Sequence, residues 1–127
     1  MNLKILFIVA HTDDEVLGLG GTIAKHSKFG DKVFGVSMTD GISSRGGFRD
    51  SEINLRQKNS FESSEILDFK WLNHANFPDN ALDTVPLIEI VREIEKAKLK
   101  IEPDIVYTHN ASDLNIDHRK VCEATLT

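Results

Sequence analysis

Apolar positions along the chain alternate between two patterns. Short apolar runs, typical of strands buried on both faces of a sheet, occupy residues 3–10, 32–38, 69–72 and 104–108. Apolar residues at helical spacing occupy residues 16–29, 51–67 (a weaker stripe), 85–100 and the stretch from residue 117 onward. Strands that alternate with helices predict βαβ units, a parallel sheet and right-handed crossovers.

Polar stretches rich in Gly, Ser, Asn and Asp separate these predicted elements. Loops are expected at residues 39–50, 73–84 and 109–116. Thr84 is predicted to cap the helix that follows it, and Thr12 with Glu15 forms a Thr-x-x-Glu capping box ahead of the first helix. The last residues stop inside a helical pattern without a Gly cap. We therefore expect a single domain over residues 1–127 that is truncated at its C-terminus.

Composition excludes several classes of protein. The 127 residues suffice for one domain, and 40% of them are apolar, so a packed core is expected. Fifteen basic residues against 20 acidic ones, with no Lys/Arg cluster, argue against a nucleic-acid partner. No apolar run approaches the ~18–20 residues of a membrane helix, so no transmembrane segment is expected. The single cysteine, Cys122, and the lack of a signal-peptide pattern favour a cytoplasmic protein.

Two loops at the carboxyl ends of predicted strands carry residues of the kinds that bind metals. One follows the first strand and the other follows the last. Because the carboxyl ends of parallel strands share one edge of a sheet, we expect these loops to meet. His11 and Asp14 from the first loop and His118 from the second would then supply two imidazoles and one carboxylate. This set suits a catalytic zinc with an open position.

The residues alone leave the metal, and the purpose of each loop, open. Asp13 would lie beside a metal-bound water and accept its proton, and the same ligands suit Fe²⁺ or another divalent metal. The first loop is also explained without function, by the capping box and by acids in the first helical turn, which the helix dipole favours. Asp117 is likewise a common kind of helix cap. Neither explanation accounts for His11, whose imidazole ends an apolar strand and needs a partner.

At these residues the chain resembles the zinc-dependent de-N-acetylases known as PIG-L or LmbE-like proteins. The family signature is a strand followed by His-Pro-Asp-Asp-Glu and a Gly-rich helix start. It stands here as Ala-His-Thr-Asp-Asp-Glu-Val-Leu-Gly-Leu-Gly-Gly-Thr-Ile-Ala at residues 10–24. The second motif, an Asp-His pair after a later strand, stands as Asp-Leu-Asn-Ile-Asp-His-Arg-Lys-Val at residues 113–121, and residues 40–45 match the pattern between the two. The resemblance spans nearly the whole chain.

The resemblance implies a Rossmann-like α/β fold, with a parallel sheet, helices on both faces and the metal at the strand ends. It implies zinc-dependent hydrolysis of a linear amide bond. The partner would be a small-molecule substrate, an N-acetylglucosamine-type conjugate. Carried over by position, the metal ligands are His11, Asp14 and His118. Asp13 is then the general base, and Asp117 orients the second motif. The resemblance leaves open whether the protein forms a homo-oligomer.

The chain departs from the family pattern at three points. Thr12 replaces the usual Pro, a change that is mild because Thr can cap the helix. Asn115 stands where many members carry a His credited with oxyanion stabilisation or acid work. Either Asn115 donates its amide hydrogen bond to the oxyanion, or another group such as His109 serves. The chain is also shorter than family members usually are, so its substrate pocket is expected to be incomplete.

Other polar residues on the same predicted edge are candidates for substrate binding. Arg45, in the loop after the second strand, is either a ligand for a phosphate or carboxylate or a solvated loop residue. Asp113 either hydrogen-bonds within its own loop or contacts a sugar hydroxyl. His109 is either a site residue or a surface one, whereas His26 and His74 are expected on the surface.

Three other functions fit parts of the sequence. A truncated fragment could bind metal without turnover. An oxygenase could use the same ligands with iron, but such sites usually lie on β-barrels. A nucleotide-binding module would need G-x-G-x-x-G after the first strand, whereas residues 18–21 read Gly-Leu-Gly-Gly within the helix and two acids would repel a pyrophosphate. Metal dependence together with acetate release distinguishes the hydrolase from all three.

Overall fold

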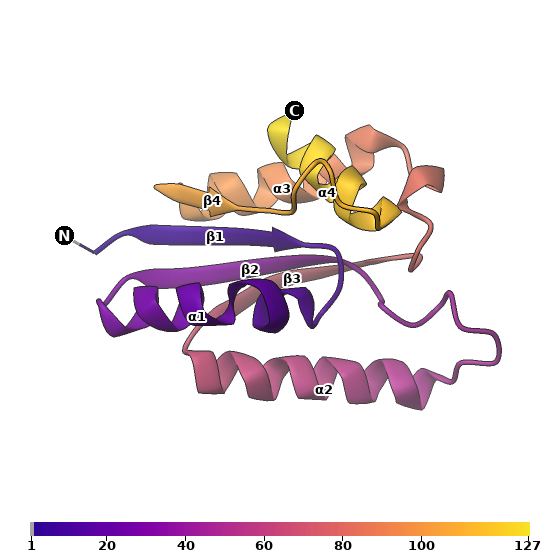
Figure 1. Cartoon of the computed structure of the whole chain (residues 1–127), viewed down its shortest axis with the longest axis horizontal. Helices are drawn as coiled ribbons and strands as arrows, with labels where there is room; N and C mark the ends of the chain where they lie inside the picture. Colours follow the sequence, from indigo (N-terminus) through magenta and orange to yellow (C-terminus); the bar gives the residue numbers. More distant parts are fainter. Residues whose placement is uncertain (1) are drawn as a thin grey trace.

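The computed structural model describes residues 2–127 and consists of a parallel sheet covered by helices on both faces (Figure 1). The strands are β1 (Lys4–Val9), β2 (Lys32–Thr39), β3 (Lys70–Phe77) and β4 (Ile105–Tyr107). The helices are α1 (Asp14–Lys28), α2 (Asp50–Leu67), α3 (Leu87–Ile101) and α4 (Ile116–Leu126), and a 3-10 turn, η1, spans Leu82–Thr84. Within residues 2–127, no helix combines the length and the apolar character needed to cross a membrane. The predicted α/β fold with a parallel sheet is confirmed.

The strand order places two loops of interest next to each other. The order is β3-β2-β1-β4, and every pair of neighbours is parallel. The chain builds outward from β1 through β2 to β3 and then returns to add β4 on the other side of β1. This reversal creates a switch point between β1 and β4, where ligands bind in open α/β sheets. The loops that follow β1 and β4 both leave the sheet there.

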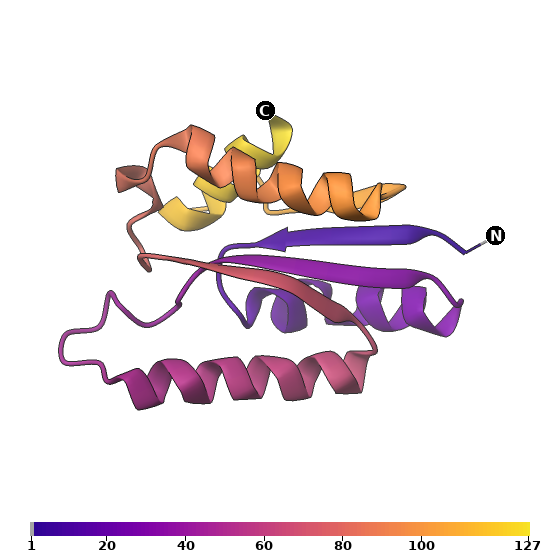
Figure 2. The same ribbon diagram turned by 180° about the vertical axis from the view of Figure 1, so that it is seen from behind.

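Alternate residues of the central strand pack against different helical layers. Ile5, Phe7 and Val9 belong to the core under α1 and α2, whereas Leu6 and Ile8 belong to the core under α3 and α4. Figure 1 shows α1 and α2 below the sheet and α3 and α4 above it, and Figure 2 shows the same two layers from behind. A continuous apolar run in β1 is therefore needed because both of its faces are covered.

The ring of Phe7 requires a glycine on the neighbouring strand. Phe7 is opposite Gly35 in the β1–β2 register, and a Cβ at Gly35 would lie 2.2 Å from Cζ of Phe7. The same ring packs edge-on against Phe69 and Trp71, with centroids 5.0 and 5.4 Å away. Close packing of β1 on β2 thus depends on the missing side chain at Gly35.

The third strand is longer than the sequence predicts. The predicted strand ends at Leu72 and a loop begins there, whereas β3 continues to Phe77. Because β3 is an edge strand that pairs only with β2, it tolerates polar residues that would be excluded from the sheet centre. Its pairing is also irregular, with register shifts and a left-handed φ of 56° at Asn76. The apolar alternation that marks a strand is therefore weak.

The predicted cap at Thr84 is also wrong. Thr84 belongs to η1, and its Oγ1 donates a hydrogen bond to the carbonyl oxygen of Ala81 at 2.6 Å. The following helix, α3, begins at Leu87 after Pro86, without a side-chain cap. Pro86 fixes a backbone φ of −53° directly before the helix, which explains why no capping side chain marks its start.

Candidate metal centre

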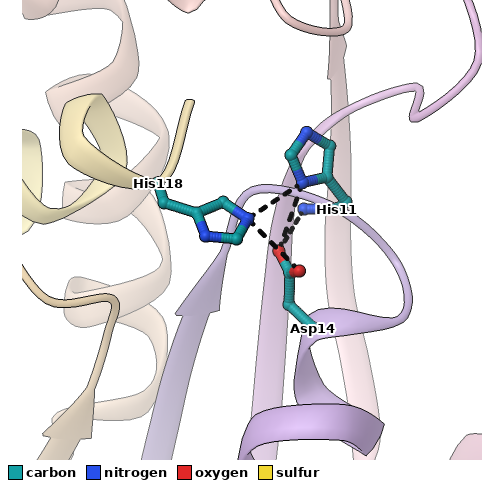
Figure 3. A group of neighbouring side chains, drawn as sticks. All are labelled: His11, Asp14 and His118. Atoms are coloured by element: carbon teal, nitrogen blue, oxygen red, sulfur yellow. Dashed lines mark hydrogen bonds and ion pairs between the residues drawn. The ribbon is translucent and has the colours of Figure 1, made fainter. Parts of the chain in front are cut away.

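Three side chains from the two loops converge at the carboxyl end of the sheet (Figure 3). His11 lies just after β1, Asp14 is the first residue of α1, and His118 is in the first turn of α4. Nδ1 of His11 lies 3.2 Å from Nε2 of His118 and 3.4 Å from Oδ2 of Asp14. Nε2 of His118 lies 3.3 Å from Oδ1 of Asp14. The structure therefore brings together the three residues predicted to bind a metal.

The donor atoms of this cluster fit a tetrahedral metal ion in spacing and in type. Metal–ligand bonds of about 2.0–2.1 Å at the tetrahedral angle place neighbouring donors about 3.3 Å apart. The two imidazole nitrogens lie 3.2 Å apart, and each lies 3.3–3.4 Å from a different carboxylate oxygen of Asp14, His118 from Oδ1 and His11 from Oδ2. Two imidazoles and one carboxylate leave a fourth position for water or substrate. Both zinc and ferrous iron accept such a donor set.

The second ring nitrogen of His11 faces two buried carboxylates. Nε2 lies 2.9 Å from Oδ2 of Asp117 and 3.2 Å from Oδ1 of Asp79. Asp117 is fully buried and also accepts hydrogen bonds from the backbone N–H groups of Asn80 and Leu82, at 2.7 and 3.0 Å. That Asp117 orients the second motif stays a prediction, and the structure adds that its carboxylate also contacts His11 of the first motif. Its carboxylate holds His11, because the chain after β3 anchors it beside the first loop.

The second ring nitrogen of His118 also has a carboxylate partner. Nδ1 of His118 lies 2.9 Å from Oδ2 of Asp113, whose Oδ1 accepts the backbone N–H of Asn115 at 2.9 Å. Of the two alternatives for Asp113, a hydrogen bond within its own loop or contact with a sugar, the structure shows the first. Both imidazoles of the cluster are therefore oriented by carboxylates on the nitrogen that faces away from the other donors. This arrangement is typical of metal-binding histidines.

Charges within the cluster hold a proton on His11 when no metal is bound. Burial alone would lower the pKa of His11, but hydrogen bonds to Asp117 and Asp14 and their negative charges raise it to about 10. Burial would raise the pKa of Asp14, but its contacts with His109 and His11 hold it well below the usual range. The carboxylate of Asp14 is thus ionised and ready to bind a cation, and a metal ion that binds His11 would displace the proton from its ring.

Asp13, the predicted base, directly precedes Asp14 in the sequence and is open to solvent. Its side chain is 54% exposed, and its Oδ2 lies 3.9 Å from Nη2 of Arg56 on α2. The same Nη2 donates to the carbonyl oxygen of Thr12 at 3.4 Å. Arg45, expected to be either a substrate ligand or a solvated loop residue, is exposed on the loop before α2. Among the described residues, its side chain makes no hydrogen bond or ion pair with the cluster.

Sequence reasoning missed two residues that the structure places at the site. Arg56 lies on a helix with a weak apolar pattern, and nothing in its spacing distinguishes it from its polar neighbours. Asp79 lies just beyond β3, at the same sheet edge as the other loops. Its Oδ2 accepts a hydrogen bond from Ser44, and its backbone N–H donates to Oγ of Ser43 at 3.0 Å. Placing the end of β3 correctly would have indicated Asp79.

Glu15 is buried and does not cap α1. The residue before α1 is Asp13, which makes no side-chain capping bond, so the predicted Thr12–Glu15 capping box is wrong. Glu15 turns inward at 1% exposure, and neither carboxylate oxygen has a hydrogen-bond partner among the described residues. Burial raises the pKa of Glu15 to about 7, and the negative charges of Asp13 and Asp14 add to the effect. A pocket of about 370 Å³ between α1 and α2 adjoins this carboxylate.

The two alternatives for the oxyanion donor occupy different environments. The ring of His109 stacks on His118 with centroids 3.9 Å apart, and its Nε2 lies 3.3 Å from Oδ2 of Asp14. That nitrogen accepts the backbone N–H of Ala10 at 2.9 Å. Asn115 is the cap of α4, and its side-chain oxygen accepts from the backbone N–H of Asp117 at 2.9 Å. His109 therefore lies against the side chains of two predicted metal ligands, whereas the oxygen of Asn115 also accepts the backbone N–H of His118 at 3.4 Å.

The two histidines expected on the surface are partly buried. Nδ1 of His26 lies 2.6 Å from Oδ2 of Asp31, and its Nε2 lies 3.0 Å from the hydroxyl of Tyr107. Nδ1 of His74 lies 2.6 Å from Oγ of Ser37. Both imidazoles therefore serve as internal hydrogen-bonding groups, which the polar residues around them in the sequence do not reveal.

A family model and several known proteins match this chain. The model for PIG-L, described as GlcNAc-PI de-N-acetylase, matches residues 6–127. The deacetylase YaiS of Escherichia coli is 32% identical over 126 residues, which cover 96% of this chain and 65% of that protein. Diacetylchitobiose deacetylase of Thermococcus kodakarensis is 35% identical over 106 residues, which cover 81% of this chain and 39% of that protein.

Solved structures show the same fold. N,N′-diacetylchitobiose deacetylase from Pyrococcus horikoshii, in complex with its inhibitor, superposes with a TM-score of 0.85 at 32% identity. The superposition covers 97% of this chain and 48% of that structure. The chain thus spans less than two thirds of the length of each of these relatives.

Proposed function

The chain belongs to the PIG-L family of de-N-acetylases, and from this premise we propose that it is a metal-dependent hydrolase of N-acetylated amino sugars. Its substrate class would be an N-acetylglucosamine-type conjugate, and its products acetate and the free amine. The observation that carries the proposal is the cluster of His11, Asp14 and His118, whose donor atoms have the spacing of a tetrahedral site. Similarity to two deacetylases of diacetylchitobiose supports the choice of sugar.

His11, Asp14 and His118 would hold the metal, for which zinc is our first choice and Fe²⁺ the second. When bound there, the ion supplies Lewis acidity to a water molecule and to the amide carbonyl. Asp117 and Asp79 fix the ring of His11, and Asp113 fixes the ring of His118, so the donor atoms are already arranged for binding. Prior arrangement of this kind lowers the cost of ordering the site.

Asp13 would accept the proton of the attacking water and pass it to the departing amine. The water oxygen forms the new C–O bond, the amide C–N bond breaks, and the proton leaves with the amine, so the reaction balances. Asp13 suits this role because it adjoins Asp14 in the sequence and its carboxylate is open to solvent. The guanidinium of Arg56, 3.9 Å from that carboxylate, would direct it toward the site.

His109 would donate the hydrogen bond that stabilises the oxyanion. Its ring stacks on His118 and its Nε2 lies 3.3 Å from Oδ2 of Asp14, so the imidazole is beside the place where the oxyanion would form. The side-chain oxygen of Asn115 caps α4, and its Nδ2 amide group is the alternative donor. Preorganised donors of this kind typically contribute about 10²–10³ in rate. A His109→Gln variant should therefore bind metal normally but release acetate more slowly by about that factor.

The proposal is tested by acetate release from N-acetylglucosamine and diacetylchitobiose, with zinc-loaded, iron-loaded and chelated protein. Asp13→Asn preserves the size of the side chain and should keep metal binding while slowing acetate release by about 10²–10⁴. Full activity in Asp13→Asn, or in the presence of a chelator, would refute the mechanism. Metal binding without acetate from any conjugate would favour the alternative, a metal-binding fragment without turnover.

A further inference from the structure

Glu15 is a buried acidic residue that the mechanism above does not use. It lies in the first turn of α1 and is 1% exposed, and neither of its carboxylate oxygens has a hydrogen-bond partner among the described residues. Polar groups buried in a fold nearly always have a partner, because an unpaired one costs free energy. Glu15 lines the pocket of about 370 Å³ between α1 and α2, so a partner for its carboxylate has to reach it through that pocket.

Arg56 faces the same pocket and also has an unpaired, buried atom. Its Nε has no hydrogen-bond partner within the part of the chain that the structure describes. Its Nη2 donates to the carbonyl oxygen of Thr12 at 3.4 Å and lies 3.9 Å from Oδ2 of Asp13. One nitrogen of the guanidinium thus contacts the loop that carries the proposed base, while another is left for a partner in the pocket that Glu15 lines.

The backbone of Gly41 packs against the guanidinium of Arg56 from a further direction. Gly41 has a left-handed φ of 68°, and a Cβ there would lie 2.8 Å from both Nε and Nη2 of Arg56 and 3.0 Å from its Cζ. The loop after β2 can approach the guanidinium this closely only because residue 41 is a glycine. Arg56 is therefore held by Thr12, Asp13 and Gly41, and its Nε is the nitrogen that still needs a partner.

A water molecule in the pocket satisfies both unpaired groups at once. It accepts a hydrogen bond from the Nε–H of Arg56 and donates one to a carboxylate oxygen of Glu15. The pocket, at about 370 Å³, has room for it, because one water molecule occupies about 30 Å³ of liquid. Bonds through such a water are nearly as favourable as direct ones. Glu15 and Arg56 can therefore be coupled without an ion pair between them.

Resting on the proposed function, we propose that Glu15 is a positioning residue, which holds the guanidinium of Arg56 through water in this pocket and so keeps Asp13 in place for proton transfer. Glu15 acts through Arg56 and not on the substrate. Without its carboxylate, the Nε side of the guanidinium loses its partner, and the contact between Arg56 and Asp13 loosens. Removal of Glu15 should therefore slow the chemical step and leave KM and metal binding unchanged.

The first test measures kcat and KM for acetate release by the zinc-loaded protein. Glu15→Met keeps the length of the side chain but accepts no hydrogen bond from water, so kcat should fall about tenfold with KM and zinc affinity unchanged. Glu15→Gln keeps an acceptor and should retain most of the rate. Ser63→Ala is the matched control and should equal the wild type, because Ser63 lines the same pocket but its hydroxyl donates to the carbonyl oxygen of Asn59 on its own helix.

A purely structural role for Glu15 predicts a different result. Glu15→Met and Glu15→Gln both fill the space, so a role in packing alone gives the two variants the same kcat. Equal kcat values for Glu15→Met and Glu15→Gln, or wild-type kcat in Glu15→Met, would overturn the inference.

A double-mutant cycle tests whether Glu15 acts through Arg56. Arg56→Met removes the guanidinium and should lower kcat by itself. Adding Glu15→Met to Arg56→Met should cause no further loss, because the group that Glu15 positions is gone. Losses that multiply in the double variant would show that the two residues act independently, which would overturn the inference.

The last test needs no substrate and therefore separates this inference from the proposed function. Nitrogen-15 NMR of the zinc-loaded protein measures how fast the Nε–H proton of Arg56 exchanges with solvent. Exchange should be about tenfold faster in Glu15→Met than in the wild type, and unchanged in Ser63→Ala. Equal exchange in Glu15→Met and the wild type would overturn the inference. An Nε–H that Glu15 protects, in a protein that releases no acetate, would refute the proposed function and support the coupling of Glu15 to Arg56.

Discussion

At the scale of single residues, His11 determines how the site is built. One of its nitrogens faces His118 and Asp14, and the other faces Asp117 and Asp79. The ring thus lies between a place for a cation and two buried carboxylates. The sequence indicates the first side, because His11 ends an apolar strand. It does not indicate the second, because the carboxylates come from segments far away along the chain.

Replacing Asp117 by Asn tests the carboxylate side of His11. Asp117→Asn removes one acceptor from a fully buried group that holds His11 and two backbone N–H groups. We expect the metal-free protein to lose about 1–3 kcal/mol of unfolding free energy, and zinc affinity to fall about 10–100-fold. Asp113→Asn is the matched control. Its carboxylate is 35% exposed, so zinc affinity should fall with a smaller loss of stability. Equal losses of stability in urea unfolding would contradict this account.

His74, which lies outside the metal centre, makes a contribution to the free energy of unfolding that depends on pH. Burial lowers the pKa of His74 below its usual value, and its ring bonds to the buried Ser37. A histidine with a lowered pKa takes up its proton more readily in the unfolded chain, so its contribution to stability is lost as the pH falls below about 6.5. His74→Phe should cost about 1 kcal/mol at pH 7.5, and less at pH 5. Urea unfolding in the presence of a chelator measures the free energy of unfolding of both proteins at the two pH values. A loss from His74→Phe that is larger at pH 5 than at pH 7.5 would contradict this prediction.

At the scale of elements, the two inner strands and the short edge strand β4 could be predicted, whereas the full length of the edge strand β3 could not. The runs that became β1 and β2 are apolar because helices cover both sides of the inner sheet. The other edge strand, β4, is short and apolar throughout, and the predicted limits of all three strands agree with the structure within about two residues. The prediction ended β3 too early because the second half of this strand, with Asn73 and Asn76, is polar and irregularly paired. A hydrophobic pattern in the sequence indicates burial, and the residues of β3 are only partly buried or exposed.

The contact between β1 and β2 gives a prediction at this scale. Gly35→Ala places a methyl group against the ring of Phe7, which Phe69 and Trp71 prevent from moving aside. Overpacking of this kind should destabilise the protein by about 1–3 kcal/mol. Phe7→Leu in the Gly35→Ala background should cost less than Phe7→Leu in the wild type, because it also relieves the clash. Additive effects in a double-mutant cycle would mean that the two residues do not limit each other's packing.

At the scale of the whole molecule, the sheet order creates the site. β4 returns to the far side of β1, so loops separated by about a hundred residues in sequence end beside each other. Parallel topology is enough to predict that His11, Asp14 and His118 meet. It is not enough to predict Arg56 or Asp79, which depend on how α2 and the end of β3 lie relative to that edge. The candidate ligands were therefore predictable from the sequence, whereas neighbouring residues such as Arg56 and Asp79 were not.

The central claim is that the loops after β1 and β4 form one metal centre, and its most direct test is zinc bound per chain at equilibrium. The comparison is between the wild type, His118→Ala and His74→Ala, a histidine outside the cluster. We predict about one zinc for the wild type and for His74→Ala, and an affinity reduced by about 100-fold or more in His118→Ala. Equal zinc binding by wild type and His118→Ala would contradict the account, because the two loops would then not share a metal.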